Sequence, residues 1–243
     1  CVQDLVAPIT VDDLGINFGP TATMSDLVAH SVVRQWFPSL VEAAELVGSI
    51  AIRNRASLIG NSANGSPAAD TAPPLIALNA SVTISSVNGE RSHSLREFFL
   101  GSRRTLCCGG EIVTSLWVPR PPPRSSSAFE RMTRRRGVDL ATCSVAAVVD
   151  GDGAVTVGLG AVGPTTILGG PAASFDFSSP HQMEGALDAL LAVATPIGDI
   201  RAGRRYRTAM LRVLARRAIL RAAEQRTDEN LDFPDVLGRR SGG

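Results

Sequence analysis

The sequence predicts an α+β fold that ends in a three-stranded antiparallel sheet with helices. Two observations predict it. Segments with apolar residues at helical spacing lie between segments in which apolar and polar residues alternate, and Gly-containing turns join neighbouring alternating segments, as in antiparallel sheets. The chain has 243 residues, 44% hydrophobic and 19% charged, which is enough apolar material for one large domain or two modest ones.

The chain begins with a predicted strand and two predicted helices. Alternating apolar residues lead into the turn FGPT, and residues 25–48 then show helical spacing, with Ser25 or Asp26 as the N-cap. Pro38 interrupts the spacing and Gly48 supplies a stop. We therefore expect the second helix to begin at Pro38.

A run of small residues follows, SLIGNSANGSPAADTAPPLIALNA at 57–80. Such a loop lets main-chain N–H groups approach a diphosphate, and a helix that begins after Asp70 or Thr71 would add positive potential. Pro73 and Pro74 suit the first turn of that helix. The run is neither a P-loop nor a Rossmann fingerprint. Composition alone leaves a cofactor loop and a purely structural loop equally open.

After this run the sequence predicts a hairpin, a short helix and a strand. Two alternating segments flank Asn88 and Gly89, a pair typical of a tight hairpin turn. LREFFLGSRRTL predicts a short helix and loop, and EIVTSLWVP predicts a strand. The segment PRPPPRSSS is stiff and then polar. We expect it to be a linker at 119–127 between a domain at 1–118 and another at 128–226.

The C-terminal domain is predicted to contain three strands and two helices. SAFERMT, ATCSVAAVV and AVTVGLGAVG have strand character, and DGDG between the last two suits a hairpin turn better than a calcium loop. HQMEGALDALLAVAT predicts the first helix.

The last helix is predicted from Ile200 onward, and the tail at 227–243 is expected to be disordered. Helical spacing predicts that its apolar residues face inward and its arginines outward. The predicted inward residues are Tyr206, Met210, Val213 and Leu214, and the predicted outward ones are Arg204, Arg205, Arg207, Arg212 and Arg216.

Charge and composition exclude several functions. A formal net charge of +1 provides no field for nucleic acid, and the arginine-rich helix has no aromatic stacking platform. The four cysteines and three histidines lack metal-ligand spacing. No run reaches the roughly 18 apolar residues of a membrane helix, and no signal peptide is evident. We expect a cytoplasmic protein with no metal site that binds neither nucleic acid nor membrane.

Several motifs in order carry a resemblance to a known family. They are IRNRASLIGNSANGSPAADTAPPLIALNASV, REFFLGSRRTL, GEIVTSLWVP, FERMTRRRGVDLA and YRTAMLRVLARRA. Together they resemble the FAD-binding subunit of molybdenum-containing hydroxylases, the xanthine dehydrogenase and carbon monoxide dehydrogenase family, from about Gly15 to Ala223. The resemblance implies the second α/β lobe of a two-lobe FAD-binding domain, followed by the three-stranded sheet with helices.

The same resemblance nominates cofactor-binding residues. The family loop is T-I-G-G-N-x-x-x-x-S-P-x-x-D, and here Ile59 replaces its first Gly, where a branched side chain resists positive φ. Arg131 stands where relatives usually have Lys, which keeps the charge but not its shape. The nominated residues are Phe18, Gly19, Ser57, Ile59, Gly60, Asn61, Ala63, Asp70, Ile112, Val113 and Arg131, while Ser66 and Pro67 match the motif.

Relatives also begin with a further lobe, whose A-G-G-T/S-D-L type motif holds much of the FAD diphosphate. Nothing in this sequence resembles that motif. Either the chain is an incomplete copy that starts at Cys1 or it is a degenerate homologue, and we expect the former.

The resemblance implies an electron-transfer role within a heterotrimer. A large subunit would oxidise a substrate at a molybdopterin centre, a small subunit would relay electrons through two [2Fe-2S] clusters, and FAD here would pass them to NAD+ or another acceptor. No acid, base or nucleophile is nominated. A flavin-free assembly subunit is the alternative, and a free-standing flavin enzyme ranks below both because the chain offers no acid/base set.

Overall fold

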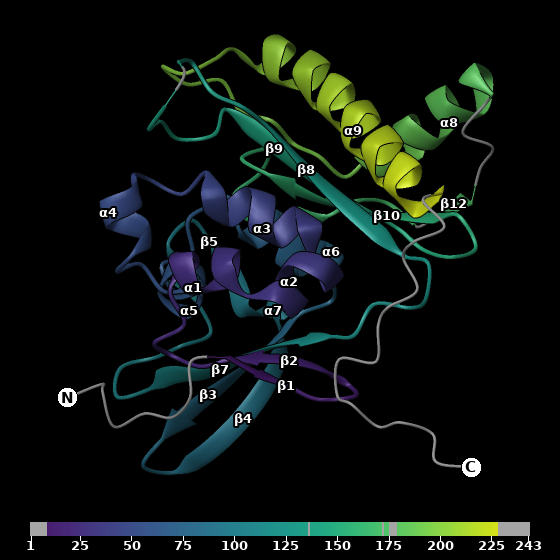
Figure 1. Ribbon diagram of the computed structural model, residues 1–243. Helices are drawn as coiled ribbons and strands as arrows, with labels where there is room; N and C mark the ends of the chain where they lie inside the picture. Colours follow the sequence, from purple (N-terminus) through teal and green to yellow (C-terminus); the bar gives the residue numbers. More distant parts are fainter. Residues whose placement is uncertain (1–8, 136, 172, 175–178, 228–243) are drawn as a thin grey trace, which may run out of the picture.

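Two antiparallel sheets enclose a layer of helices in the computed structural model, which describes residues 9–135, 137–171, 173–174 and 179–227 (Figure 1). A second helical layer, α8 (Pro180–Leu191) and α9 (Arg204–Thr227), covers the outer face of the C-terminal sheet. The mixed helix and sheet architecture confirms the predicted fold class.

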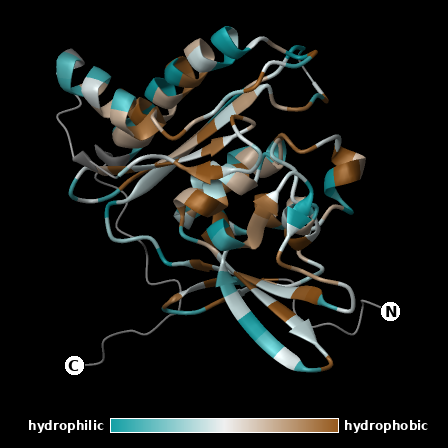
Figure 2. Cartoon of the chain, turned by 180° about the vertical axis from the view of Figure 1, so that it is seen from behind, coloured by the Kyte–Doolittle hydropathy of each residue, from teal (hydrophilic) through white to brown (hydrophobic). Residues whose placement is uncertain are grey.

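The N-terminal sheet has the strand order β1-β2-β7-β3-β4, and every neighbouring pair is antiparallel. The predicted hairpin at Asn88 and Gly89 joins β3 to β4, whose residues are mostly exposed and hydrophilic (Figure 2). The predicted strand EIVTSLWVP is the central β7, which contributes Val113, Leu116 and Val118 to the core. The bounds are β1 (Ile9–Val11), β2 (Gly15–Phe18), β3 (Ser81–Ser86), β4 (Gly89–Ser94) and β7 (Ile112–Pro119).

The helical segment at 25–48 differs from the prediction of two helices capped by Ser25 or Asp26. It forms three short helices, and Thr23 is the first N-cap, because Asp26 N donates to Thr23 Oγ1 (3.1 Å) while Thr23 N donates to Asp26 Oδ2 (2.9 Å). His30, in extended conformation, ends the first helix and caps the second. The bounds are α1 (Met24–Ala29), α2 (Ser31–Trp36), α3 (Pro38–Glu45) and α4 (Ile50–Arg53).

The run of small residues is also more helical than predicted. Leu58–Ala63 forms α5, because Ser57 Oγ accepts a hydrogen bond from Gly60 N (3.1 Å) and the Leu58 and Ile59 side chains enter the core. α6 (Ala72–Ala77) has Pro73 and Pro74 in its first turn, as predicted. Asp70 does not cap α6, and Thr71 occupies the cap position without a capping side-chain hydrogen bond.

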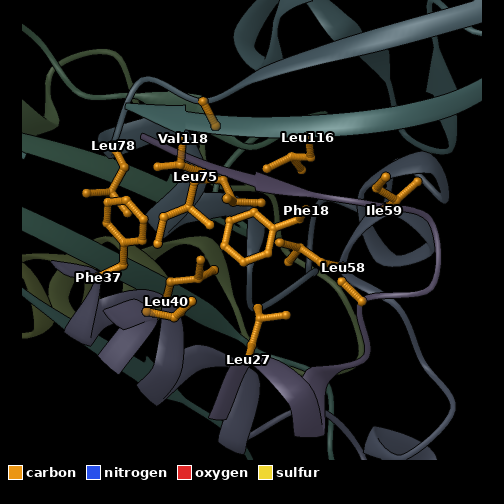
Figure 3. Packing of buried hydrophobic residues seen from close by; sticks show 14 of the residues in the cluster. Phe18, Leu27, Phe37, Leu40, Leu58, Ile59, Leu75, Leu78, Leu116 and Val118 are labelled. Atoms are coloured by element: carbon orange, nitrogen blue, oxygen red, sulfur yellow. The ribbon is translucent and has the colours of Figure 1, made fainter. Parts of the chain in front are cut away.

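Apolar side chains from α1, α3, α5 and α6 meet those of β2 and β7 in the N-terminal core (Figure 3). A short helix, α7 (Leu95–Phe98), and a two-stranded hairpin, β5 (Phe99–Gly101) with β6 (Arg104–Thr105), follow β4. The labelled core residues in Figure 3 are Phe18, Leu27, Phe37, Leu40, Leu58, Ile59, Leu75, Leu78, Leu116 and Val118.

The C-terminal sheet contains the three predicted strands, β8 (Ser126–Met132), β9 (Cys143–Val149) and β10 (Ala154–Gly160), in antiparallel order. The predicted turn DGDG joins β9 to β10, and Asp150 Oδ1 accepts from Ala154 N (2.8 Å). Two short strands that the sequence did not predict, β11 (Ile167–Leu168) and β12 (Ala173–Ser174), pair with the other edge of β10. Each has two residues, too few for a sequence pattern.

The predicted faces of α9 are partly wrong. Tyr206 is 50% exposed and Val213 is also exposed, whereas Leu214 is buried as predicted. Arg207 is 1% exposed, because it reaches main-chain carbonyls of the sheet and a carboxylate. The tail predicted to be disordered, apart from Thr227, lies outside the described residues.

The helical layer and the C-terminal sheet are in close contact. β10 packs on α6 so tightly that a Cβ atom at Gly158 would lie 2.0 Å from Pro73 O. Phe129 N donates to Glu42 Oε2 (2.7 Å), and Ala161 N donates to Pro67 O (2.7 Å). The predicted linker at 119–127 runs from the end of β7 into β8, and a domain boundary there stays a prediction.

Candidate functional site

A cavity of about 390 Å³ opens between the small-residue segment and the loop that follows β8. This volume falls within the range of about 300 to 1,000 Å³ that is usual for small-molecule sites. Its lining combines polar and apolar side chains, which suits a ring with a polar edge. The lining residues are Val47, Gly48, Asn61, Asn64, Ser66, Ala68, Ala69, Asp70, Arg135, Val138, Asp139 and Leu140.

Asp70 is the buried acidic group of this cavity. Arg131 Nη1, from β8, donates to Asp70 Oδ2 at 2.6 Å, and both side chains are 10% exposed. Asp70 Oδ1 is buried and has no hydrogen-bond partner among the described residues. Burial raises the pKa of Asp70 to about 6, although Arg131 acts in the opposite direction. Such a buried, unsatisfied acceptor is costly unless a ligand satisfies it.

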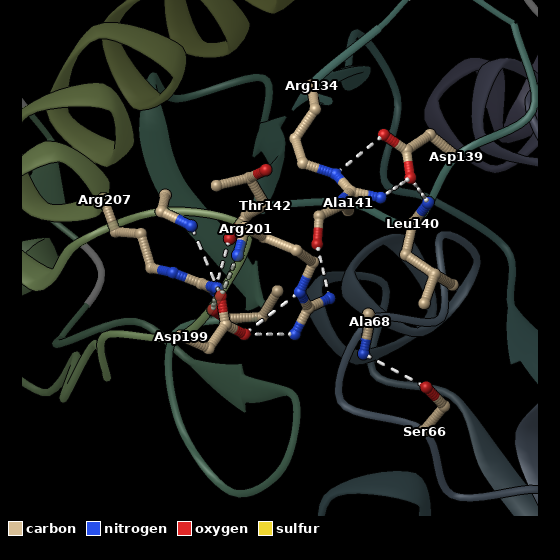
Figure 4. Close-up of polar contacts among 12 residues, drawn as sticks. Ser66, Ala68, Arg134, Asp139, Leu140, Ala141, Thr142, Asp199, Arg201 and Arg207 are labelled. Carbon is tan, nitrogen blue, oxygen red and sulfur yellow. Dashed lines mark hydrogen bonds and ion pairs between the residues drawn. The ribbon is translucent and has the colours of Figure 1, made fainter.

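The opposite wall is the loop that follows β8, in which two arginine side chains bind residues of the same loop; Figure 4 shows the first of them, Arg134. Arg134 Nη2 donates to Asp139 Oδ1 at 2.9 Å, and Arg135 Nη2 donates to Val138 O at 3.0 Å. The hydrogen bond from Arg134 lowers the pKa of Asp139 to about 2. The loop therefore presents Val138 and Leu140 as an apolar wall, with the Asp139 carboxylate, ionised at neutral pH, beside it.

The floor carries hydrogen-bonding groups of α5 and the following loop. Thr71 Oγ1 donates to Asn61 Oδ1 at 2.7 Å, which leaves the Asn61 amide nitrogen as a donor for a ligand. Ala68 N donates to Ser66 Oγ at 3.3 Å and holds the loop in place (Figure 4).

The structure brings only some of the nominated residues together. Asn61 and Asp70 line the cavity, and Arg131 contacts Asp70. Ser57 and Gly60 form the first turn of α5, and Ala63 is its last residue. Gly19 follows β2 and is buried.

The nominated apolar residues lie elsewhere. Phe18, Ile59 and Val113 pack in the N-terminal core. Ile112 is 53% exposed and lines a separate depression with Val87. Ile59 does not adopt the positive φ that a branched side chain resists, because it lies in α5, and its side chain is 5% exposed within the core (Figure 3). Ile59 is not among the residues that line the cavity.

The sequence interpretation missed the apolar half of the cavity. Val47 and Gly48 were assigned only to a helix end, and the loop residues Val138, Asp139 and Leu140 were not nominated. The motif FERMTRRRGVDLA was the available signal, since it contains that loop and Arg131 together.

Comparisons with known proteins agree with this architecture. Residues 3–121 match the family model described as FAD binding domain in molybdopterin dehydrogenase, and residues 127–222 match the CO dehydrogenase flavoprotein C-terminal domain. The carbon monoxide dehydrogenase medium chain of Hydrogenophaga pseudoflava is 30% identical over 208 residues, which is 83% of this chain and 72% of that protein. The nicotine 6-hydroxylase medium subunit of Paenarthrobacter nicotinovorans is 30% identical over 215 residues, 85% of this chain and 75% of that protein.

Solved structures show the same fold. A carbon monoxide dehydrogenase from Hydrogenophaga pseudoflava, which lacks the Mo-pyranopterin moiety of its cofactor, matches with a TM-score of 0.82 at 28% identity over 92% of this chain and 79% of that one. Quinoline 2-oxidoreductase from Pseudomonas putida 86 matches with a TM-score of 0.80 at 25% identity, over 91% of this chain and 79% of that one. The fold and these relatives define a flavoprotein component of a molybdenum enzyme. The chain belongs to the family of FAD-binding medium subunits of molybdenum hydroxylases.

The residues of the cavity fit part of such a cofactor. FAD joins two ring systems through a diphosphate, and the buried acceptor Asp70 Oδ1 would match a hydroxyl or N–H donor of one half. The apolar wall of Val138 and Leu140 would cover a ring face. Among the described residues, no group of three or more His, Cys, Asp or Glu could hold a metal ion, and no helix there is long and apolar enough to cross a membrane.

Proposed function

We propose that this chain is the electron-transfer subunit of a molybdopterin-dependent hydroxylase or dehydrogenase. In this proposal a large subunit carries the molybdopterin, a small subunit carries the [2Fe-2S] clusters, and the three form a heterotrimer in the cytoplasm. The single observation that supports FAD binding in this chain most strongly is the cavity with the buried, unsatisfied Asp70 Oδ1. Free thiols at Cys107, Cys108 and Cys143 suit a reducing compartment.

FAD, when bound, would supply the redox chemistry, taking electrons from the iron–sulfur clusters and passing them to NAD+ or another acceptor. The residues of this chain would bind and orient it. The Asn61 amide would donate a hydrogen bond to the cofactor and Asp70 would accept one, with Arg131 holding the Asp70 carboxylate. Val138 and Leu140 would exclude water from one ring face. None of these groups is required as an acid or base.

The flavin-free assembly subunit remains the second candidate. The replacement of Gly by Ile59 does not favour it, because the Ile59 side chain packs in the core and is not among the residues that line the cavity. Visible absorption of the assembled complex distinguishes the two. A flavin spectrum with one FAD released by acid per copy of this chain supports the electron-transfer role, and no flavin in the complete complex would leave only the assembly role.

Asp70→Ala is expected to weaken FAD affinity by about 1.5 to 3 kcal/mol, because a hydrogen bond to a charged acceptor is lost. Flavin titration of the reconstituted complex measures this change. Asp188→Ala is the matched control, since Asp188 is an exposed acid on α8 that pairs with Arg212. Equal FAD affinity in the wild type and Asp70→Ala would remove Asp70 from the binding site.

A further inference from the structure

The two oxygens of the Asp70 carboxylate have different surroundings. Oδ2 accepts the 2.6 Å hydrogen bond from Arg131 Nη1, whereas Oδ1 has no partner among the described residues and belongs to a side chain that lines the cavity. The Asp70 residue is 8% exposed, so water has little access to the free oxygen. A buried carboxylate arranged in this way is ready for one further donor.

Arg131 is fixed as firmly as the carboxylate it holds. It lies near the end of β8, an edge strand of the C-terminal sheet, opposite Ser144 of β9, and its side chain is 10% exposed. A guanidinium only donates hydrogen bonds, so Arg131 can bind one carboxylate oxygen but cannot act as an acceptor for a ligand donor. The contact thus leaves Oδ1 as the carboxylate oxygen without a partner among the described residues.

We propose that Arg131 is a positioning residue, which holds Asp70 through Oδ2 and keeps Oδ1 ionised and directed at a hydroxyl or N–H donor of the dinucleotide. This inference rests on the proposed function, because it assigns roles within the same site. Arg131 acts through Asp70, since it contacts that carboxylate and is not among the residues that line the cavity.

The charges around Asp70 make FAD affinity depend on pH. Burial raises the pKa of Asp70 to about 6 and Arg131 lowers it, so removal of Arg131 raises that pKa further. The other charged groups that line the cavity are Arg135 and Asp139. Asp139 does not change charge near pH 6, because the hydrogen bond from Arg134 lowers its pKa to about 2. A ligand donor needs the ionised carboxylate, so affinity falls as the pH drops below the pKa of Asp70, by up to about tenfold per pH unit.

The test is FAD affinity of the reconstituted complex, measured by flavin titration over about pH 5 to 8. For the wild type we expect affinity to fall below about pH 6. For Arg131→Met we expect the same fall to begin at a higher pH, and for Arg131→Lys we expect a partial return toward the wild-type profile, because the charge is restored without the planar geometry. Arg34→Met, which removes an exposed arginine, is the control and should keep the wild-type profile.

Asp70→Asn provides a second measurement if Arg131→Met does not fold. In this variant Arg131 would donate to the amide oxygen of Asn, so the amide NH2 group would face the donor of the ligand. We expect FAD affinity to be about 10- to 100-fold lower and not to fall further near pH 6. An unchanged pH profile in Arg131→Met, or a retained fall in Asp70→Asn, would overturn the positioning role while FAD binding stands. Absence of FAD from the wild-type complex at every pH would overturn the proposed function itself.

Discussion

Gly158→Ala is expected to lower the free energy of unfolding by about 3 kcal/mol, because β10 and α6 are in main-chain contact at this position. An added Cβ would lie 2.0 Å from Pro73 O and 2.7 Å from Pro73 C. Both are backbone atoms, so no change of rotamer relieves the clash, and the sheet and helix must separate. Gly160 also lies against α6, since an added Cβ there would lie 2.8 Å from Pro73 Cγ.

This substitution should also affect the cofactor cavity. α6 begins two residues after Asp70, so a displacement of Pro73 moves the carboxylate relative to Arg131. We therefore expect weaker FAD affinity in Gly158→Ala as well as lower stability. The two measurements are urea unfolding monitored by circular dichroism and flavin titration.

Gly185→Ala is the matched control. Gly185 lies on the exposed side of α8, and nothing is within 4 Å of its added Cβ. Alanine is a better helix former than glycine by about 1 kcal/mol, so this variant should be slightly more stable than the wild type. If Gly158→Ala were as stable as Gly185→Ala, the close packing of β10 on α6 would be wrong.

The elements that the sequence predicted well are those with a strong local pattern. β8, β9 and β10 have β-branched or alternating residues between clear turns, and the β3–β4 hairpin has Asn88 and Gly89 at its turn. Such signals depend on neighbouring residues only. The helix at Leu58–Ala63 was missed because its glycine and small residues suggest a loop, while its stability comes from the Ser57 cap and from burial of Leu58 and Ile59.

The candidate site was predictable only in part. Asn61 and Asp70 were found because they belong to one short motif, and Arg131 because it belongs to another. The contact between Asp70 and Arg131 joins residues 61 positions apart, and no local pattern specifies it. Val138 and Leu140 were missed for the same reason. Their apolar side chains are exposed, and they line a cavity only because the loop after β8 lies opposite the small-residue segment.

Arg207 shows how tertiary contacts override helical amphipathicity. Arginine is seldom fully buried unless it is paired, and helical spacing placed Arg207 outward with its neighbours. Instead it donates from Nη1 to Thr142 O (2.7 Å) and Ala161 O (2.9 Å) and from Nη2 to Asp199 Oδ1 (2.6 Å) (Figure 4). It thereby joins α9 to the ends of β9 and β10 and to the loop that precedes the helix.

Arg207→Met is therefore expected to lower the free energy of unfolding by about 3 to 5 kcal/mol, the usual cost of removing one partner of a buried charged network. Arg205→Met, on the exposed side of the same helix, should change it by no more than about 0.5 kcal/mol. Denaturant unfolding of both variants near neutral pH measures the difference. Similar free energies of unfolding for the two variants would mean that the hydrogen bonds of Arg207 do not stabilise the fold.

Acid should reduce the difference between Arg207→Met and the wild type. Burial acts to raise the pKa of Asp199, but hydrogen bonds from Arg201 and Arg207 outweigh it and hold that pKa well below its usual range. A lowered pKa stabilises the folded state above the unfolded value of about 3.9, and this contribution is lost as the pH falls toward the folded value. As the pH falls from about 4 toward the folded value, the wild type gradually loses the stability that the Arg207–Asp199 contact contributes, whereas the variant lacks that contact at every pH, so the two unfolding free energies should converge. A difference that stays constant on acidification would show that the two carbonyl hydrogen bonds, and not Asp199, account for the effect of Arg207.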